Sequence, residues 1–346
     1  MCQTFVRKRY KTNSGRSGLD WGIERPVLAI SLSRNATVVP PEKAALRDRQ
    51  RGRRNWCYQT YSALSLLKAS LFTNCNSAGV IEMLGGTGGL WEFKASLLAS
   101  HGFAALALAY LSYDDIHELP SSMDMEYFEE AANWLSSHPK VLPHGIGVHA
   151  ICYGSWAALL MASLGMKAVK ALVAISPVIN AFPIPFSYKG KVSEILPFEN
   201  SQKISTKEGS IWRYAIPAVN DVSTPVSNYS PITPVENISC PVLLAYGTGD
   251  LNVGSDFATE LIFNRLKAHG KERLCSILRY PEAGHLIEPP YTPHCYSSFS
   301  GITAKWSGDH YLVWGGEMNA HAKAQEDAWP KILRFLRINL QHSSNL

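Results

Sequence analysis

The chain has 346 residues, of which 46% are hydrophobic and 18% charged, a composition typical of a packed globular protein. The formal net charge of +5 is uneven, because residues 1–54 carry thirteen Lys/Arg against four Asp/Glu and the remainder is mildly acidic. Nucleic-acid enzymes carry their basic face on the folded domain, so we expect no nucleic-acid partner. No apolar run approaches the ~18 residues of a membrane-spanning helix, and we expect no membrane span.

The net positive charge comes from the segment 1–57, which shows no sustained apolar period and is predicted to be poorly ordered. The seven cysteines are scattered and include no CxxC pair, which indicates a reducing compartment and neither a zinc site nor a disulfide framework. The final tripeptide Ser344-Asn345-Leu346 is one residue away from the S-K-L peroxisomal signal. We therefore expect a cytoplasmic or peroxisomal protein.

From residue 58 onward, apolar strand-like runs alternate with helical stretches. The predicted strands lie at residues 78–84, 103–110, 146–151, 169–175, 242–246 and 276–280, and the predicted helices at 91–100, 123–137, 155–164, 255–268 and 320–340. Near-continuous apolar strands that alternate with helices predict an α/β domain with a mostly parallel, doubly wound sheet covered on both faces.

One long stretch breaks this rhythm. Residues 178–236 are rich in Pro, Ser and Asn and show no clear period, although they lie between two predicted core strands. Insertions of this kind usually form a cap or a wall over a binding site. We therefore expect one domain over residues 58–346, with a cap inserted near 178–236.

The most informative motif is an apolar strand, a sharp turn at Cys152 and a helix of small residues. This layout is typical of the nucleophile elbow of α/β-hydrolases, with Cys in place of Ser and Ala150 in place of the first Gly of G-x-S-x-G. The helix N-terminus favours the thiolate over the thiol. A free Cys is most often a buried structural thiol, but this setting predicts that Cys152 is a nucleophile that forms an acyl thioester. Ser155 is less favoured because it falls inside the helix.

The predicted acid partner is Asp250. It ends a Gly-rich turn after the strand at 242–246, and α/β-hydrolases place the acid after the nucleophile in chain order. A turn Asp also serves as a cap or in an Asx-turn, and that interpretation suits the fallback residue Asp256 better, because Asp256 lies in the first turn of the next predicted helix.

The predicted base is His285. It lies on a loop after the strand at 276–280 and directly follows a Gly, which completes the order nucleophile, acid, His. His149 precedes the elbow on its strand and would need a different orientation to reach the site. His310 and His321 come later, outside this order.

A Gly-rich run at residues 83–90 follows the first predicted strand. It lacks the lysine and spacing of a phosphate-binding loop. It is similar to the loops whose backbone N–H groups bind a developing oxyanion, although a flexible turn is the alternative. We expect Gly86 and Thr87 to lie nearest the reacting carbonyl, with the N–H of Tyr153 as the second donor.

Several further blocks resemble the family of type I acyl-CoA thioesterases and bile acid-CoA:amino acid N-acyltransferases. The blocks lie at residues 96–103, 113–115, 266–272, 280–291, 313–317 and 320–329. The resemblance extends from about residue 58 to 340 and implies an α/β-hydrolase fold. Cys152, Asp250 and His285 match the nucleophile, acid and base of the family, and residues 85–89 match its Gly-rich loop.

The resemblance also implies the substrates. It predicts acyl-CoA thioester cleavage in fatty acid or bile acid metabolism, with coenzyme A as part of the substrate and no separate cofactor or metal. Water, glycine or taurine would take the acyl group. Lys189 and Lys191 in the expected cap are candidates for contacts with the phosphates of coenzyme A, and a solvated surface pair is the alternative.

Two departures from the family bear on this prediction. Members carry an immunoglobulin-like β-sandwich before the catalytic domain, whereas the residues before position 58 show no seven-strand pattern. The thioesterases of the family mostly use Ser as the nucleophile, whereas the N-acyltransferase uses Cys. The Cys at position 152 therefore favours an amine as the acceptor of the acyl group. A Cys-based hydrolase like dienelactone hydrolase and a truncated, non-catalytic relative stay open as alternatives.

Overall fold

The computed structural model describes residues 57–61, 67–73, 76–180, 183–196, 199–215 and 226–341. The chain divides into two compact units, Met1–Asn55 and Trp56–Leu346, and all described residues belong to the second. The predicted poorly ordered segment 1–57, apart from Cys57, and the C-terminal tripeptide 344–346 lie outside the described residues, so both interpretations stay predictions.

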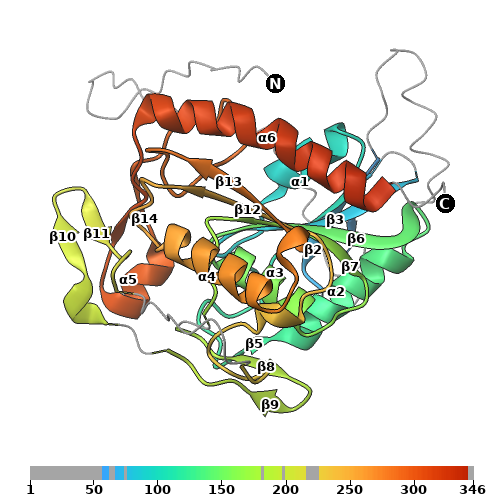
Figure 1. The fold of residues 1–346 in the computed structure, drawn as a ribbon, viewed down its shortest axis with the longest axis horizontal. Helices are drawn as coiled ribbons and strands as arrows, with labels where there is room; N and C mark the ends of the chain where they lie inside the picture. The colour runs from blue at the N-terminus through green and yellow to red at the C-terminus, as the bar shows by residue number, and fades with distance from the viewer. Residues whose placement is uncertain are drawn as a thin grey trace, which may run out of the picture. The chain divides into compact units, whose positions relative to one another are not determined.

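An eight-stranded sheet with the strand order β1-β2-β4-β3-β6-β7-β12-β13 forms the centre of this unit (Figure 1). Its strands are β1 (Cys57–Tyr61), β2 (Ala69–Thr73), β3 (Ser77–Met83), β4 (Ala104–Leu108), β6 (Val141–Ile151), β7 (Val169–Ile175), β12 (Val242–Gly247) and β13 (Cys275–Tyr280). Six neighbouring strands of the sheet run parallel, namely β4, β3, β6, β7, β12 and β13. At one edge, β2 runs antiparallel to both of its neighbours, β4 and β1. All six parallel strands were predicted, which confirms the α/β-hydrolase fold class.

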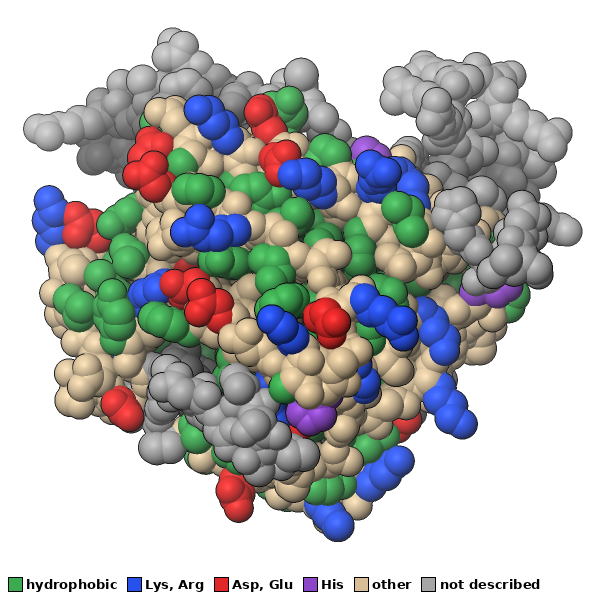
Figure 2. Space-filling model, viewed as in Figure 1, with side chains coloured by type: hydrophobic (Ala, Val, Ile, Leu, Met, Phe, Trp, Pro, Cys, Tyr) green, Lys and Arg blue, Asp and Glu red, His purple; other side chains and the backbone are tan. Residues whose placement is uncertain are grey.

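Helices cover both faces of the sheet (Figure 1). The first face buries apolar residues of α1 (Glu92–Ser100) and α6 (Met318–Gln341), and the second those of α2 (Met125–Ser137), α3 (Tyr153–Ser163) and α4 (Ser255–Ala268). On the surface shown in Figure 2, Lys/Arg and Asp/Glu side chains are interspersed. None of the helices in the described part of the chain is both long and apolar enough to cross a bilayer.

The region expected to form a cap contains short strands that join two small sheets. The first sheet has the order β5-β8-β9 and the second β10-β11-β15-β14. Their members are β5 (Met123–Asp124), β8 (Phe186–Tyr188), β9 (Lys191–Val192), β10 (Ile204–Thr206), β11 (Gly209–Ile211), β14 (Ser297–Phe299) and β15 (Tyr311–Val313). Strands β14 and β15, with α5 (Gly301–Ser307) between them, belong to a second excursion that follows His285 and that the sequence analysis did not single out.

A buried charge cluster joins elements beneath the carboxyl edge of the sheet. The Nζ atom of Lys94 on α1 lies 3.1 Å from Oε1 of Glu82 on β3 and 3.4 Å from Oε1 of Glu288. Burial raises the pKa of Glu82 to about 7, although the Lys94 ammonium opposes that shift. The cluster connects the strand before the Gly-rich loop to the segment just after His285.

His149 lies beside this cluster, because it pairs with Glu82 across β6 and β3. The side chain is 1% exposed, its ring packs edge-on against Trp329 with 6.1 Å between centroids, and neither ring nitrogen has a hydrogen-bond partner among the described residues. Burial, together with the Lys94 charge, lowers the pKa of His149 to about 3. His149 is therefore an uncharged core residue in the folded protein.

This burial predicts a specific loss of stability in acid. The unfolded chain protonates His149 below a pKa of about 6.5, whereas the folded chain keeps the ring neutral down to about 3, so the free energy of unfolding falls as the pH drops below about 6.5. We expect wild type to lose ~1 kcal/mol more than His149→Leu between about pH 7.5 and about pH 5.5 in urea unfolding. Equal losses in the two proteins would contradict an uncharged, buried His149.

Candidate active site

Cys152 lies at the turn between β6 and α3 with φ 57° and ψ −128°, a left-handed conformation that is unfavourable for a residue other than Gly. The turn packs closely against the Gly-rich loop. A Cβ atom on Gly154 would lie 2.4 Å from the carbonyl oxygen of Leu84, and one on Gly85 would lie 2.8 Å from Cβ of Cys152. Glycine is therefore required at both positions to bring the loop to the sulfur.

Asp250 and His285 meet across the ends of β12 and β13. Nδ1 of His285 lies 2.8 Å from Oδ2 of Asp250, and both side chains are fully buried. The carboxylate also accepts hydrogen bonds from the backbone N–H groups of Asn252 (2.9 Å) and Val253 (3.1 Å) and from Oγ of Ser255 (2.7 Å). Because the carboxylate acts as an acceptor throughout, Nδ1 of His285 donates to it and Nε2 is left to act on the substrate side.

The environment of His285 favours its charged form. Burial lowers the pKa of His285, but the Asp250 carboxylate and the sulfur of Cys152 outweigh burial and raise the pKa well above its ordinary value. The buried Nε2 makes no hydrogen bond of ordinary length and angle within the described residues. The structure therefore holds an imidazolium, paired with Asp250, beside the sulfur of Cys152.

The three expected oxyanion-hole residues gather at the same place. Gly86, Thr87 and Tyr153 line one pocket together with Cys152. Within the described residues, their backbone N–H groups donate no hydrogen bond to another backbone or side-chain group. Unpaired N–H groups beside a nucleophile are the arrangement that stabilises a developing oxyanion.

The rest of this pocket is mostly apolar and comes from the cap, from the loop after β12 and from the second excursion. Val178 and Trp212 line it from the cap, and Leu312 and Trp314 line it from the second excursion. The ring of Trp314 stacks on His285 with 5.4 Å between centroids. The pocket therefore suits an apolar acyl group next to Cys152.

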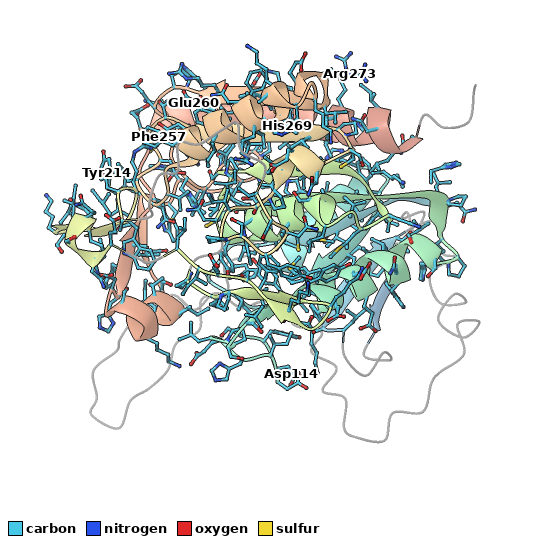
Figure 3. All side chains as sticks on the ribbon, turned by 60° about the horizontal axis from the view of Figure 1, so that its bottom comes forward. Asp114, Tyr214, Phe257, Glu260, His269 and Arg273 are labelled. Carbon is cyan, nitrogen blue, oxygen red and sulfur yellow. The ribbon has the colours of Figure 1, made fainter. Side chains whose placement is uncertain are left out.

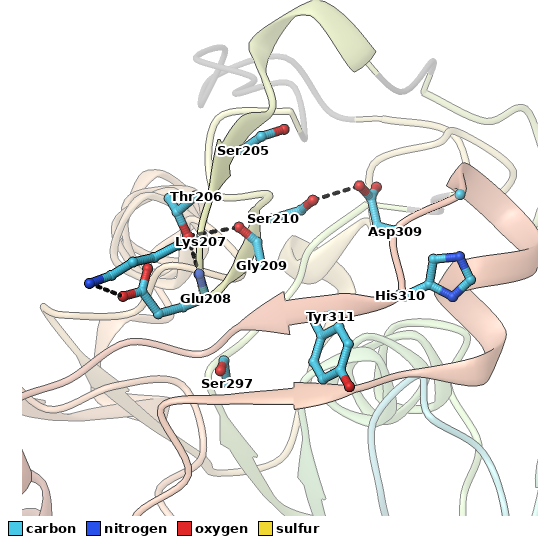
Figure 4. Close-up of a pocket in the computed structure, with 11 residues that line it drawn as sticks. Ser205, Thr206, Lys207, Glu208, Gly209, Ser210, Ser297, Asp309, His310 and Tyr311 are labelled. Atoms are coloured by element: carbon cyan, nitrogen blue, oxygen red, sulfur yellow. Dashed lines mark hydrogen bonds and ion pairs between the residues drawn. The ribbon is translucent and has the colours of Figure 1, made fainter.

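Asp309 fixes the position of Trp212. Its carboxylate accepts from Nε1 of Trp212 (3.2 Å), Nζ of Lys203 (2.7 Å) and Oγ of Ser210 (2.5 Å). Figure 4 shows the bond from Ser210 to Asp309 in an open polar groove between β10–β11 and β15. None of the predicted catalytic residues lines that groove.

The other candidates from the sequence are engaged elsewhere. Asp256 pairs with Arg213 at 2.5 Å, and Arg213 lies over the rings of Tyr214 and Phe257, which lie close together near the start of α4 (Figure 3). Oγ of Ser155 donates to the carbonyl oxygen of Cys152 at 2.5 Å. Neither side chain therefore takes the place of Asp250 or Cys152.

Lys189 and Lys191 lie on the β8–β9 hairpin and do not line the pocket at Cys152. Both are exposed, with Nζ 4.8 Å from the ring centroid of Tyr188 for Lys189 and 5.3 Å from that of Tyr229 for Lys191. Phosphate contacts from these lysines stay a prediction. Elsewhere in the described ranges, no group of three His, Cys, Asp or Glu side chains is placed to hold a metal ion.

Sequence reasoning missed several residues around the base. Trp212 comes from a stretch without a regular period, and Trp314 was noted only as part of the block at residues 313–317 that resembles the family. His321 was set aside because of its position in the chain, yet α6 places it against the loop that carries His285. Only its place on the apolar side of a long amphipathic helix signalled burial.

The sequence is similar to those of curated proteins over about three quarters of the chain. Human bile acid-CoA:amino acid N-acyltransferase is 44% identical over 263 residues, covering 76% of this chain and 60% of that protein. Mouse acyl-coenzyme A thioesterase 2, mitochondrial, is 40% identical over 77% of this chain and 56% of that protein. The chain thus spans about three fifths of the length of these curated relatives.

The fold also matches a solved structure. An acylaminoacyl peptidase from Pyrococcus horikoshii aligns with a TM-score of 0.52 at 14% identity, covering 84% of this chain and 43% of the peptidase. The sequence model for "BAAT / Acyl-CoA thioester hydrolase C terminal" matches residues 123–342, which is more than half of the chain. The chain therefore belongs to the BAAT / acyl-CoA thioester hydrolase C-terminal family, as its motifs predicted.

Proposed function

We propose that this protein cleaves acyl-CoA thioesters through an acyl-Cys152 intermediate and passes the acyl group to the amino group of glycine or taurine. Water is the competing acceptor. The observation that carries the proposal is the buried Asp250–His285 pair beside a Cys at the nucleophile elbow. The unpaired N–H groups of Gly86, Thr87 and Tyr153 support it.

In the first half of the reaction, the Sγ thiolate of Cys152 attacks the thioester carbonyl carbon. The oxyanion accepts hydrogen bonds from the loop and from Tyr153, a contribution of ~2.7–4 kcal/mol per donor in comparable sites. The bond between the acyl carbon and the sulfur of coenzyme A then breaks. Nε2–H of His285 gives its proton to the departing thiolate, which leaves neutral His285 and acyl-Cys152.

In the second half, the neutral amine attacks acyl-Cys152 and Nε2 of His285 takes the amine proton. The carbon–sulfur bond breaks, the amide is released and the thiolate–imidazolium pair is restored. A thioester reacts with amines more readily, relative to water, than an oxygen ester does, so a Cys nucleophile favours an amine acceptor. The relatives include proteins named as amino acid N-acyltransferases, which supports this choice.

Hydrolysis is the second candidate function, because the same acyl-enzyme reacts with water when no amine is bound. Relatives named acyl-coenzyme A thioesterases, at 37–40% identity, favour it. The acceptor and the acyl chain are therefore parts of the proposal that product analysis must decide.

Product analysis by mass spectrometry tests the proposal. We expect a long-chain or bile acyl-CoA to give an N-acyl amino acid when glycine or taurine is present, and Cys152→Ala to reduce release of coenzyme A by ~10³-fold or more. Cys152→Ser is expected to shift the product toward free acid.

Cys275→Ala is the matched control, because burial raises the pKa of Cys275 to about 12 and keeps it unreactive. No release of coenzyme A by wild type would contradict the proposal and favour a non-catalytic relative.

The lysines of the β8–β9 hairpin give a separate prediction. We propose that Lys189 and Lys191 contact phosphates of coenzyme A through exposed, solvent-screened surface contacts. Lys189→Ala and Lys191→Ala should then raise the KM for acyl-CoA about two- to five-fold at low salt and leave kcat unchanged. Lys207→Ala, at an exposed lysine of the β10–β11 turn, is the control. An unchanged KM in both hairpin variants would show that these lysines are solvated surface residues.

A further inference from the structure

The imidazole of His321 on α6 bonds to the loop that carries His285, once on each side of that residue. Nδ1 of His321 accepts a hydrogen bond from the backbone N–H of Gly284 at 3.0 Å. Nε2 of the same ring lies 2.8 Å from the carbonyl oxygen of Leu286. The two partners are the residues immediately before and after His285, so His321 holds both flanks of the base. The side chain of His321 is 2% exposed.

These two bonds require one protonation state of the ring. The carbonyl of Leu286 only accepts, so Nε2 of His321 must carry a hydrogen. The N–H of Gly284 only donates, so Nδ1 must not carry one. Burial lowers the pKa of His321, which agrees with a neutral ring. The ring of His321 therefore pairs with one backbone donor and one backbone acceptor. An apolar side chain at this position could pair with neither.

Other contacts hold the backbone of His285 itself. Its N–H donates to the carbonyl of Trp314 at 3.0 Å, and Oγ of Ser176 donates to its carbonyl oxygen at 2.6 Å. The bonds from His321 control the direction of the chain on either side of that residue. A rotation of the loop about His285 would carry Nε2 away from the sulfur, and a displacement of about 1 Å at a reacting group costs as much as ~10²-fold in rate.

We infer that His321 is a positioning residue that sets the place of the His285 ring relative to Cys152. It acts through the loop and touches neither the substrate nor the reacting atoms. The inference rests on the proposed function only for its kinetic readout, because the state of the Cys152 thiolate reports on His285 without any substrate.

The test compares three variants of the full chain. His321→Leu removes both bonds, His321→Asn keeps an acceptor for Gly284, and His321→Gln keeps a donor for Leu286. His269→Leu is the matched control, because the ring of His269 also bonds to a backbone carbonyl oxygen (Nδ1 to Arg265, 2.8 Å) but lies at the end of α4 (Figure 3). The readouts are the pH profile of Cys152 alkylation by iodoacetamide, located by peptide mapping, and kcat and KM for acyl-CoA. Urea unfolding measures the stability of each variant.

We expect His321→Leu to slow alkylation of Cys152 at neutral pH by about five-fold or more and to lower kcat by ~10- to 10²-fold with KM within about two-fold. His321→Asn and His321→Gln should fall between wild type and His321→Leu, and His269→Leu should match wild type. A folded His321→Leu with the alkylation profile of wild type would overturn the inference. If His321→Leu does not fold, wild-type profiles in both His321→Asn and His321→Gln would overturn it. If wild type cleaves no acyl-CoA, the proposed function fails, and the alkylation profiles still decide the role of His321.

Discussion

The hydrogen bond between Nδ1 of His285 and Oδ2 of Asp250 is the interaction on which the account of the site depends. It forms between fully buried side chains, and two backbone N–H groups and one hydroxyl complete the hydrogen bonding of the carboxylate. A buried carboxylate that accepts these hydrogen bonds fixes both the tautomer and the orientation of the imidazole. In the proposed mechanism, attack by Cys152 and proton transfer to the leaving group both depend on this pair.

The fold assembles the site by bringing four loops to the carboxyl edge of one sheet. The Gly-rich loop follows β3, the elbow follows β6, the loop that carries Asp250 follows β12, and the loop that carries His285 follows β13. Beneath them, the ammonium of Lys94 lies between Glu82 on β3 and Glu288 beyond His285. Removing one partner from a buried ion pair costs ~3–5 kcal/mol, so this cluster couples the geometry of the oxyanion loop to that of the base loop.

Much of this arrangement was predictable, for identifiable physical reasons. Strands such as β7 are buried on both faces and read as continuous apolar runs, so their positions were predicted within a few residues. Strands β1 and β2 were missed because short antiparallel strands at an edge mix polar and apolar residues. The chain order of Cys152, Asp250 and His285 identified the candidates, but their contacts required the fold.

The remaining parts depend on contacts between distant segments, which leave no local signal. The side of the pocket that contains Leu312 and Trp314 comes from the excursion after His285. Strand β15 of that excursion pairs with β11 of the cap at one residue pair, Ser210 and Leu312. His321 lies in one of the blocks that resemble the family, at residues 320–329, but its role follows from which loop α6 packs against. Lys189 and Lys191 were selected for their charge and their place in the expected cap, and neither feature specifies a contact with a ligand.

The central claim is that Cys152 carries the acyl group between coenzyme A and the acceptor. The most direct measurement mixes wild-type protein with an acyl-CoA in the absence of an amine, quenches in acid within the first turnovers and maps the added mass by peptide mass spectrometry. The account predicts an acyl group on the peptide that contains Cys152, removed by hydroxylamine and discharged when glycine or taurine is added before the quench. Release of coenzyme A without any acylated Cys152 would contradict it and would mean that water or the amine attacks the thioester directly.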